Sequence, residues 1–185
     1  MTPDHDGTAE PRPTVVLCAD AAYRIPLAVV VASLARHHRS APLAIVVLHQ
    51  GIVAADRAAV EALAGDHVVT WVEPDDARLA SSRLPDHLPP AALFRLLAPS
   101  LLVDTSRFVY LDTDVVVRGD LAALVDLDLA GHPVAAVRDA WIGVAGAPNG
   151  PPAAELGMAP TSPYFNSGVM VVDGRAWREE GIVDE

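Results

Sequence analysis

The sequence contains no lysine and a single cysteine. All 13 basic residues are arginines, and 24 acidic residues give a formal net charge of -11. An acidic surface repels the nucleic-acid backbone, which argues against a nucleic-acid partner, and a P-loop is excluded because it needs a lysine. Cys18 has no second cysteine to pair with. That usage fits a reducing compartment and predicts a cytoplasmic location.

Long apolar runs are also missing. The longest, residues 25–35, has about half of the ~20 residues that a helix needs to cross a bilayer, so we expect no membrane span. Residues 1–13 are polar, acidic and proline-containing, unlike a targeting signal, and are predicted to be a disordered tail. The remaining residues 14–185 are apolar enough to bury one core and are expected to form a single domain.

Short apolar runs alternate with segments of helical periodicity. The runs that predict buried strands cover residues 14–19, 43–48, 68–72, 108–111, 133–137 and 164–172. The segments that predict helices cover residues 26–38, 54–64 and 91–102, a short stretch capped by Asp120, and another that ends near residue 180. Residues 73–90 are expected to form a connection. This alternation is typical of an α/β fold in which helices flank a mostly parallel central sheet.

Aspartates stand at the carboxyl ends of three predicted strands. They are Asp20, Asp112 and Asp139. Ligands of open α/β sheets bind at this edge, so the three side chains are candidates to bind one. Aspartates at strand ends also serve as caps and turn residues, and that structural role stays open for each of them.

Asp112 and Asp114 form the most informative pair. We expect the chain to stay extended through residues 115–117, which would point both carboxylates to one side, with their Cα atoms roughly 6–7 Å apart. Two carboxylates at one place favour a cation between them, and oxygen ligands suit Mn²⁺ or Mg²⁺. Such an ion would also let an acidic protein bind a nucleotide diphosphate.

A haloacid-dehalogenase-type phosphatase is the main competing interpretation of this segment. Its nucleophile motif is similar to four apolar residues followed by Asp-x-Asp, as in residues 108–114. That family needs a later lysine and begins its domain with this strand. Because lysine is absent and the strand lies in mid-chain, we disfavour the phosphatase.

Five segments together resemble glycosyltransferase family 8, the retaining sugar transferases of the GT-A fold. In chain order they are residues 16–23, 93–99, 108–117, 126–139 and 164–172. The resemblance implies that residues 14–185 form the larger, N-terminal part of a GT-A domain. In that family an Asp-Gln-Asp-like segment, a histidine, and a glycine and lysine would follow residue 185, so we expect the domain to be incomplete at this end.

The resemblance also implies a donor site built from five residues. Asp20 would contact the uracil edge, and Tyr23 would stack on the base. Arg95 would reach the phosphate or sugar oxygens of the donor. Asp112 and Asp114 would hold Mn²⁺ or Mg²⁺ and, through it, the diphosphate. Structural alternatives stay open: Tyr23 as a rim aromatic and Arg95 as an ion-pair partner.

The implied activity is metal-dependent transfer of glucose or galactose from a UDP-sugar to a hydroxyl of a carbohydrate or lipid-linked glycan, with retention. Asp139 and Asn166 are the catalytic candidates, expected to hydrogen-bond sugar hydroxyls near the reacting carbon, although Asn166 also suits a turn or bulge. Ala22 stands where the family has asparagine, which weakens the uridine assignment. The alternative is a non-catalytic nucleotide-sugar-binding fragment, or a split half that needs a partner chain.

Overall fold

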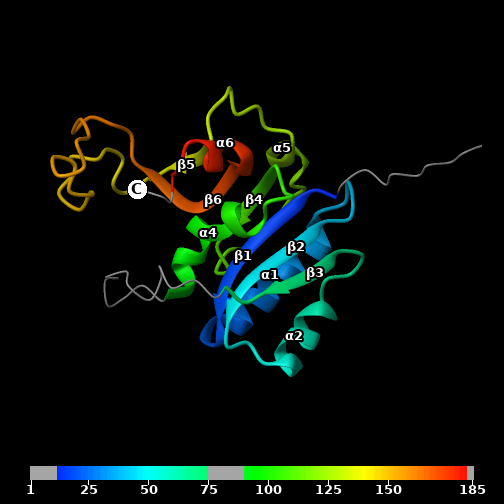
Figure 1. The fold of residues 1–185 in the computed structure, drawn as a ribbon. Coiled ribbons are helices and arrows are strands. Elements are labelled where there is room, and N and C mark those ends of the chain that lie inside the picture. The colour runs from blue at the N-terminus through cyan, green and yellow to red at the C-terminus, as the bar shows by residue number, and fades with distance from the viewer. Residues whose placement is uncertain (1–11, 75–89, 183–185) are drawn as a thin grey trace, which may run out of the picture.

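The structure, a computed structural model, describes residues 12–74 and 90–182 and contains one six-stranded sheet (Figure 1). The strands are β1 Thr14–Asp20, β2 Ala44–Gln50, β3 Val68–Val72, β4 Arg107–Leu111, β5 Val134–Arg138 and β6 Phe165–Asp173. Their order across the sheet is β3-β2-β1-β4-β6-β5. Only β6 is antiparallel to its neighbours, so the predicted α/β fold with a mostly parallel sheet is confirmed.

Helices cover both faces of this sheet (Figure 1). They are α1 Arg24–His37, α2 Ala54–Glu61, α4 Phe94–Leu101, α5 Ala122–Val125 and α6 Gly174–Glu179, with short 3₁₀ helices at Ala21–Tyr23 and Pro90–Leu93. Most of the predicted tail and of the connection over 73–90 lies outside the described residues. Within them, no helix is long and apolar enough to cross a membrane.

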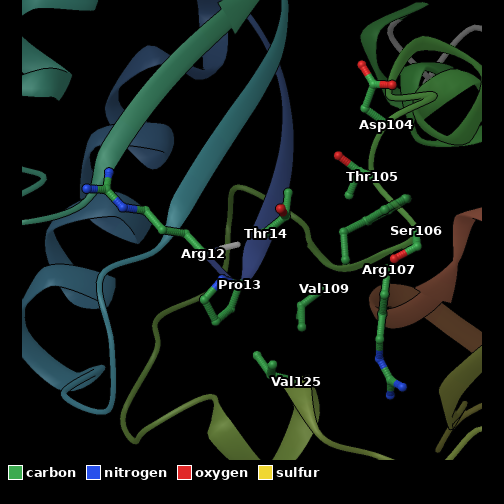
Figure 2. Close-up of a pocket in the computed structure, with 10 residues that line it drawn as sticks. Arg12, Pro13, Thr14, Asp104, Thr105, Ser106, Arg107, Val109 and Val125 are labelled. Carbon is green, nitrogen blue, oxygen red and sulfur yellow. The ribbon is translucent and has the colours of Figure 1, made fainter. Parts of the chain in front are cut away.

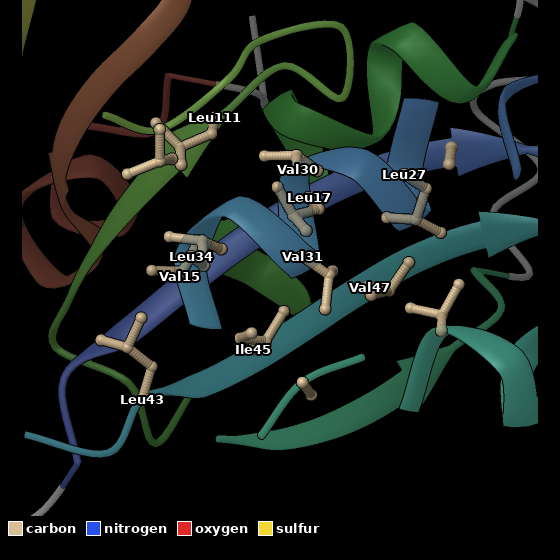
Figure 3. Packing of buried hydrophobic residues seen from close by; sticks show 14 of the residues in the cluster. Val15, Leu17, Leu27, Val30, Val31, Leu34, Leu43, Ile45, Val47 and Leu111 are labelled. Atoms are coloured by element: carbon tan, nitrogen blue, oxygen red, sulfur yellow. The ribbon is translucent and has the colours of Figure 1, made fainter. Parts of the chain in front are cut away.

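The side chains of β1 alternate between two hydrophobic cores. Val15 and Leu17 face α1 and α2, where they pack with Leu27 and Val31 (Figure 3). Cys18 faces the opposite way, into the core under α4 and α6, and burial raises the pKa of its thiol to about 12. Full burial of a leucine or valine side chain stabilises the fold by about 1.5–3 kcal/mol. The two cores therefore fix β1 at the centre of the sheet.

Asp120 joins two parts of the chain that are far apart in sequence. Its Oδ1 atom accepts a hydrogen bond at 2.8 Å from the N–H group of Ala122, the first residue of α5. Its Oδ2 atom accepts from Arg39 N at 2.7 Å and Ser40 N at 2.9 Å, just beyond α1. Asp120 therefore lies one residue before the N-cap position, which Leu121 occupies. Its side chain still holds the first N–H group of α5, and it also anchors the chain just beyond α1.

The prediction that the chain stays extended over residues 115–117 is wrong. Strand β4 ends at Leu111, a turn covers Thr113 and Asp114, and residues 115–118 form no strand in the described part of the chain. The backbone is drawn toward α1 instead, because Val117 N donates to Ser33 Oγ at 3.0 Å and the Val117 side chain is buried in the core. Asp112 and Asp114 are therefore not aligned as residues i and i+2 of an extended chain.

Candidate functional site

The carboxyl ends of β1, β4 and β5 meet at one edge of the sheet, as predicted. Strands β1 and β4 are paired in parallel, and β6 lies antiparallel between β4 and β5. Asp112 N donates to Gly168 O at 2.7 Å, and Asp139 N donates to Tyr164 O at 2.9 Å. The start of β6, with Asn166, is therefore held between two of the predicted aspartates.

Asp112 lies in a network of side chains from β4, β6 and α4. The Tyr110 hydroxyl donates to Asp112 Oδ1 at 2.7 Å, and Arg95 Nη1 lies 3.2 Å from the same oxygen. Arg95 Nη1 also donates to Ser167 Oγ at 3.0 Å and Ser167 O at 3.2 Å. The Arg95 guanidinium lies over the Tyr110 ring, 5.0 Å from its centroid. The Arg95 guanidinium is thus held beside the Asp112 carboxylate, which agrees with the ion-pair role expected as its structural alternative.

Tyr110 is almost fully buried beneath this network. Burial, the largest cause, raises the pKa of its hydroxyl far above the ordinary value. The hydroxyl therefore keeps its proton at any physiological pH and remains a hydrogen-bond donor to Asp112.

Gly168 leaves room for two oxygen atoms. A Cβ atom at this position would lie 2.7 Å from Asp112 Oδ2 and 2.9 Å from Asn166 Oδ1. Asn166 Oδ1 accepts a hydrogen bond from Gly168 N at 2.8 Å, close to a bulge in the β5–β6 pairing. Asn166 lies in β6 beside this bulge, which agrees with the turn or bulge role expected as its alternative. Gly168 cannot be replaced by a larger residue without displacing Asp112 or Asn166.

Asp139 closes a tight turn after β5. Its Oδ1 atom accepts from Trp141 N and Ile142 N, both at 2.8 Å. These backbone hydrogen bonds, and a weaker one from the Asn166 side chain, lower the pKa of Asp139 below its ordinary value. Asp139 and Asn166 are therefore brought together, and Asp139 is ionised at neutral pH.

Asp20 closes a similar turn after β1. Its Oδ1 atom accepts from Ala22 N at 2.9 Å and Tyr23 N at 3.1 Å, which caps the 3₁₀ helix that leads into α1. Tyr23 is 41% exposed, so the ring can stack on a ligand. Oδ2 of Asp20 accepts no hydrogen bond from any residue that the structure describes.

Asp112 and Asp114 offer carboxylate oxygens of the kind that Mn²⁺ and Mg²⁺ prefer. Asp114 is exposed and makes no hydrogen bond or ion pair with another described residue. No group of three or more His, Cys, Asp or Glu side chains could hold a metal within residues 12–74 and 90–182. By the chemistry of their oxygens alone, these two carboxylates fit a divalent cation.

Three residues of this site carried no predicted role: Tyr110, Ser167 and Gly168. Tyr110 stands two residues before Asp112, and the alternation of a strand places such positions on one face, so its contact with Asp112 could have been inferred. The contacts of Ser167 and Gly168 required knowing that β6 lies antiparallel beside β4.

Two cavities of about 300 Å³ lie near these strands. One adjoins the site and is lined mainly by apolar side chains, including Leu96, Phe165 and Trp177, with Arg95 and Ser167 at its border. The other lies at the amino ends of β1 and β4, far from the predicted ligand edge (Figure 2). Figure 2 shows the side chains of Arg12 and Arg107 extending away from each other, so they do not form a common anion site.

Comparison with known proteins gives a consistent result. The family model described as Glycosyl transferase family 8 matches residues 14–185. The chain is 29% identical over 176 residues to glycosyltransferase GlyF of Streptococcus pneumoniae, covering 94% of this chain and 39% of that protein. It is 35% identical over 102 residues to lipopolysaccharide 1,2-glucosyltransferase of Escherichia coli, covering 51% of this chain and 27% of that protein.

The fold is similar to that of a solved galactosyltransferase. LgtC, in complex with donor and acceptor sugar analogues, matches with a TM-score of 0.78 and 30% identity, covering 92% of this chain and 61% of that chain. The sheet described above is accordingly the GT-A fold. The chain spans less than two-fifths of either curated relative and about three-fifths of LgtC.

Proposed function

The chain belongs to glycosyl transferase family 8, and from that premise we propose that it transfers glucose or galactose from a UDP-sugar to an acceptor hydroxyl, with retention and with Mn²⁺ or Mg²⁺. The observation that carries the proposal is the Asp112 network. In this network a carboxylate and a fixed arginine lie at the carboxyl edge of the sheet, and the catalytic candidates Asp139 and Asn166 lie at the same edge, which supports the proposal.

Arg95 and the two aspartates suit the diphosphate of such a donor. Asp112 and Asp114 would hold the cation, which when bound would take up negative charge on the departing diphosphate. Arg95 is already held within hydrogen-bond distance of Asp112 and Ser167. A guanidinium fixed in this way can donate charge-assisted hydrogen bonds to phosphate oxygens without first losing side-chain freedom.

The turn after β1 suits the nucleoside. Asp20 uses one oxygen to hold the turn and keeps the other for the uracil edge, while the exposed Tyr23 ring offers a stacking surface. Asp20 ends β1, the strand next to β4, and Tyr23 ends the 3₁₀ helix that follows it, so base and diphosphate would bind along one edge.

Transfer breaks the bond between the anomeric carbon and the β-phosphate oxygen, and the electron pair leaves with UDP. The acceptor hydroxyl oxygen bonds to the same face of the anomeric carbon and gives its proton to the departing phosphate oxygen. Asp139, held ionised by two backbone N–H groups, would accept hydrogen bonds from sugar hydroxyls beside Asn166. These contacts would orient the hexose for attack.

LgtC was solved with a sugar acceptor analogue, and by that likeness we propose a carbohydrate or lipid-linked glycan as the acceptor here. A reaction that draws on nucleotide sugars, and a thiol that is free and buried, both agree with a cytoplasmic location. Peripheral contact with a membrane would bring the chain to a lipid-linked acceptor.

A non-catalytic nucleotide-sugar-binding module is the second candidate. It is favoured by the cation site, where the described residues supply two carboxylates and no further protein ligand. A site with one ligand fewer binds its cation more weakly, and the cation then stabilises the leaving group less.

Calorimetric titration with UDP, with and without Mn²⁺, followed by a donor-hydrolysis and transfer assay, separates these possibilities. Mn²⁺-dependent binding with turnover supports the enzyme, binding without turnover supports the module, and no binding in either condition contradicts both. Asp104→Asn is a matched control for Asp112→Asn, because Asp104 is an exposed aspartate at the opposite edge of the sheet.

A further inference from the structure

We propose that Tyr110 is a positioning residue that holds Asp112 so that Oδ2, and not Oδ1, faces the divalent cation. The proposal rests on the function proposed above, because the cation belongs to that reaction. It assigns a role to a buried side chain that touches neither the donor nor the cation.

The first observation concerns Oδ1 of Asp112. Two donors reach this oxygen, the Tyr110 hydroxyl at 2.7 Å and Arg95 Nη1 at 3.2 Å. An oxygen that already accepts a short hydrogen bond and contacts a guanidinium has little capacity left for a metal ion. Oδ1 is therefore the poorer of the two ligand atoms.

The second observation concerns Oδ2. No hydrogen bond to this atom comes from the described residues, and it lies over Gly168, where a Cβ atom would stand only 2.7 Å away. Asn166 Oδ1 lies over the same glycine. Oδ2 is thus presented at the site beside a second oxygen atom and is free to bind a cation.

The packing of Tyr110 keeps its hydroxyl directed at Asp112 Oδ1. The Tyr110 ring is 1% exposed, lies in the core under α4 and α6, and carries the Arg95 guanidinium on its face. A ring packed in this way cannot swing away from Asp112. Asp112 itself is only partly buried and would otherwise rotate between two equivalent placements of its oxygens.

Two effects of the hydroxyl oppose each other. It withdraws some charge from the carboxylate, which weakens metal binding, and it fixes the orientation of the carboxylate, which strengthens it. Arg95 would still neutralise the carboxylate if the hydroxyl were removed, so the charge would change little. Loss of a partner that orients a metal ligand typically lowers metal affinity 10- to 100-fold, so we expect orientation to dominate.

Tyr110→Phe tests the proposal, with Tyr164→Phe as the matched control. The Tyr164 hydroxyl bonds to no described residue, and its ring stacks near Phe165, a contact that phenylalanine keeps. Mn²⁺ affinity is measured from the electron paramagnetic resonance signal of free Mn²⁺, with and without UDP. We expect about tenfold weaker Mn²⁺ binding for Tyr110→Phe and an unchanged affinity for Tyr164→Phe.

Two further readouts separate positioning from damage to the fold. Saturating Mn²⁺ should restore the UDP affinity of Tyr110→Phe to the wild-type value, which it would not do for a damaged fold. If Tyr110→Phe does not fold, Gly168→Ala tests the same orientation from the other side, since its methyl group would crowd Oδ2 and should weaken Mn²⁺ binding.

Equal or tighter Mn²⁺ binding by Tyr110→Phe would overturn the proposal, and so would wild-type Mn²⁺ affinity in Gly168→Ala. If the wild-type chain binds UDP but no Mn²⁺, the metal dependence of the proposed function fails, and the role of Tyr110 fails with it. If wild-type binds Mn²⁺ and both variants match it, only the role of Tyr110 fails.

Discussion

The aspartates that follow β1 and β5 differ from the one that follows β4. Asp20 and Asp139 each use Oδ1 to accept two backbone N–H groups from the next three residues, and Asp139 also accepts a hydrogen bond from the Asn166 side chain of β6. Asp112 has contacts with Tyr110, with Arg95 from a separate helix, and with Gly168 from β6. The first two mainly shape the loops that follow their strands. The third is organised by tertiary structure, and we expect it to matter most for function.

The largest effect is expected from Asp112→Asn. The change removes the charge that the cation needs and breaks the ion pair between Asp112 and Arg95. Mn²⁺-dependent UDP binding should be lost, and transfer should fall by about 100-fold or more. Titration calorimetry and a transfer assay measure both effects.

Asp104→Asn is the control for this variant and should behave like the wild type. Wild-type activity in Asp112→Asn would contradict the expectation that Asp112 matters more for function than Asp20 and Asp139.

Gly168→Ala should have the next largest effect. Its Cβ atom would stand 2.7 Å from Asp112 Oδ2 and 2.9 Å from Asn166 Oδ1, and Tyr110 and Arg95 prevent Asp112 from moving away freely. Such overpacking costs about 1–3 kcal/mol of stability, to be measured by urea denaturation, and should weaken donor binding roughly tenfold.

Gly119→Ala is the matched control for this glycine, because no atom lies within 4 Å of the Cβ position there. A Gly168→Ala protein as stable as Gly119→Ala, and with full donor affinity, would show that the close approach is unimportant.

Asp20 allows the turn role to be separated from the ligand role. Asparagine caps as well as aspartate does, so Asp20→Asn should keep the stability of the wild type but bind UDP more weakly, by a few-fold. Asp20→Ala should lose the cap as well, lowering the free energy of unfolding by about 0.5–2 kcal/mol. Denaturation and UDP titration of both variants give the comparison. Equal UDP affinity in Asp20→Asn and wild type would leave Asp20 with a structural role only.

The smallest effect concerns pH. Hydrogen bonds from Ile142 N and Trp141 N lower the pKa of Asp139 below the ordinary 3.8, so the folded state favours the ionised form. Stability from this turn is therefore present above about pH 4 and is lost as pH falls through the lowered pKa. The amide resonances of Trp141 and Ile142 should titrate below pH 3.8 in the wild type and not in Asp139→Asn. Titration at or above the ordinary value would contradict the two hydrogen bonds.

Local features of the fold could be predicted from the sequence, as the turns at these aspartates show. Strand β3 was predicted with its observed bounds, 68–72, because a short apolar run is a local signal. The hydrogen bonds that Asp20 and Asp120 accept at the start of the next helical segment likewise involve neighbours within three residues. The family resemblance predicted that Asp139 and Asn166 belong to one site, and in the structure the two side chains lie together.

Contacts between distant segments could not be predicted. Arg95 and Ser167 are 72 positions apart, and their hydrogen bond depends on how α4 lies against the start of β6. The extended chain expected over residues 115–117 failed for the same reason, since Ser33 on α1 binds Val117 N, 84 positions away. Apolar patterning indicated these elements but contained no information about which polar groups would meet.

The most direct test of the account is the position of the cation itself. Crystals grown with UDP and Mn²⁺ would locate the ion by its anomalous scattering. The account predicts a Mn²⁺ ion bound to the Asp112 and Asp114 carboxylates and to both phosphates of UDP, with Oδ2 as the Asp112 ligand atom. UDP bound at this edge with no ion on Asp112, or an ion held by other residues, would contradict it.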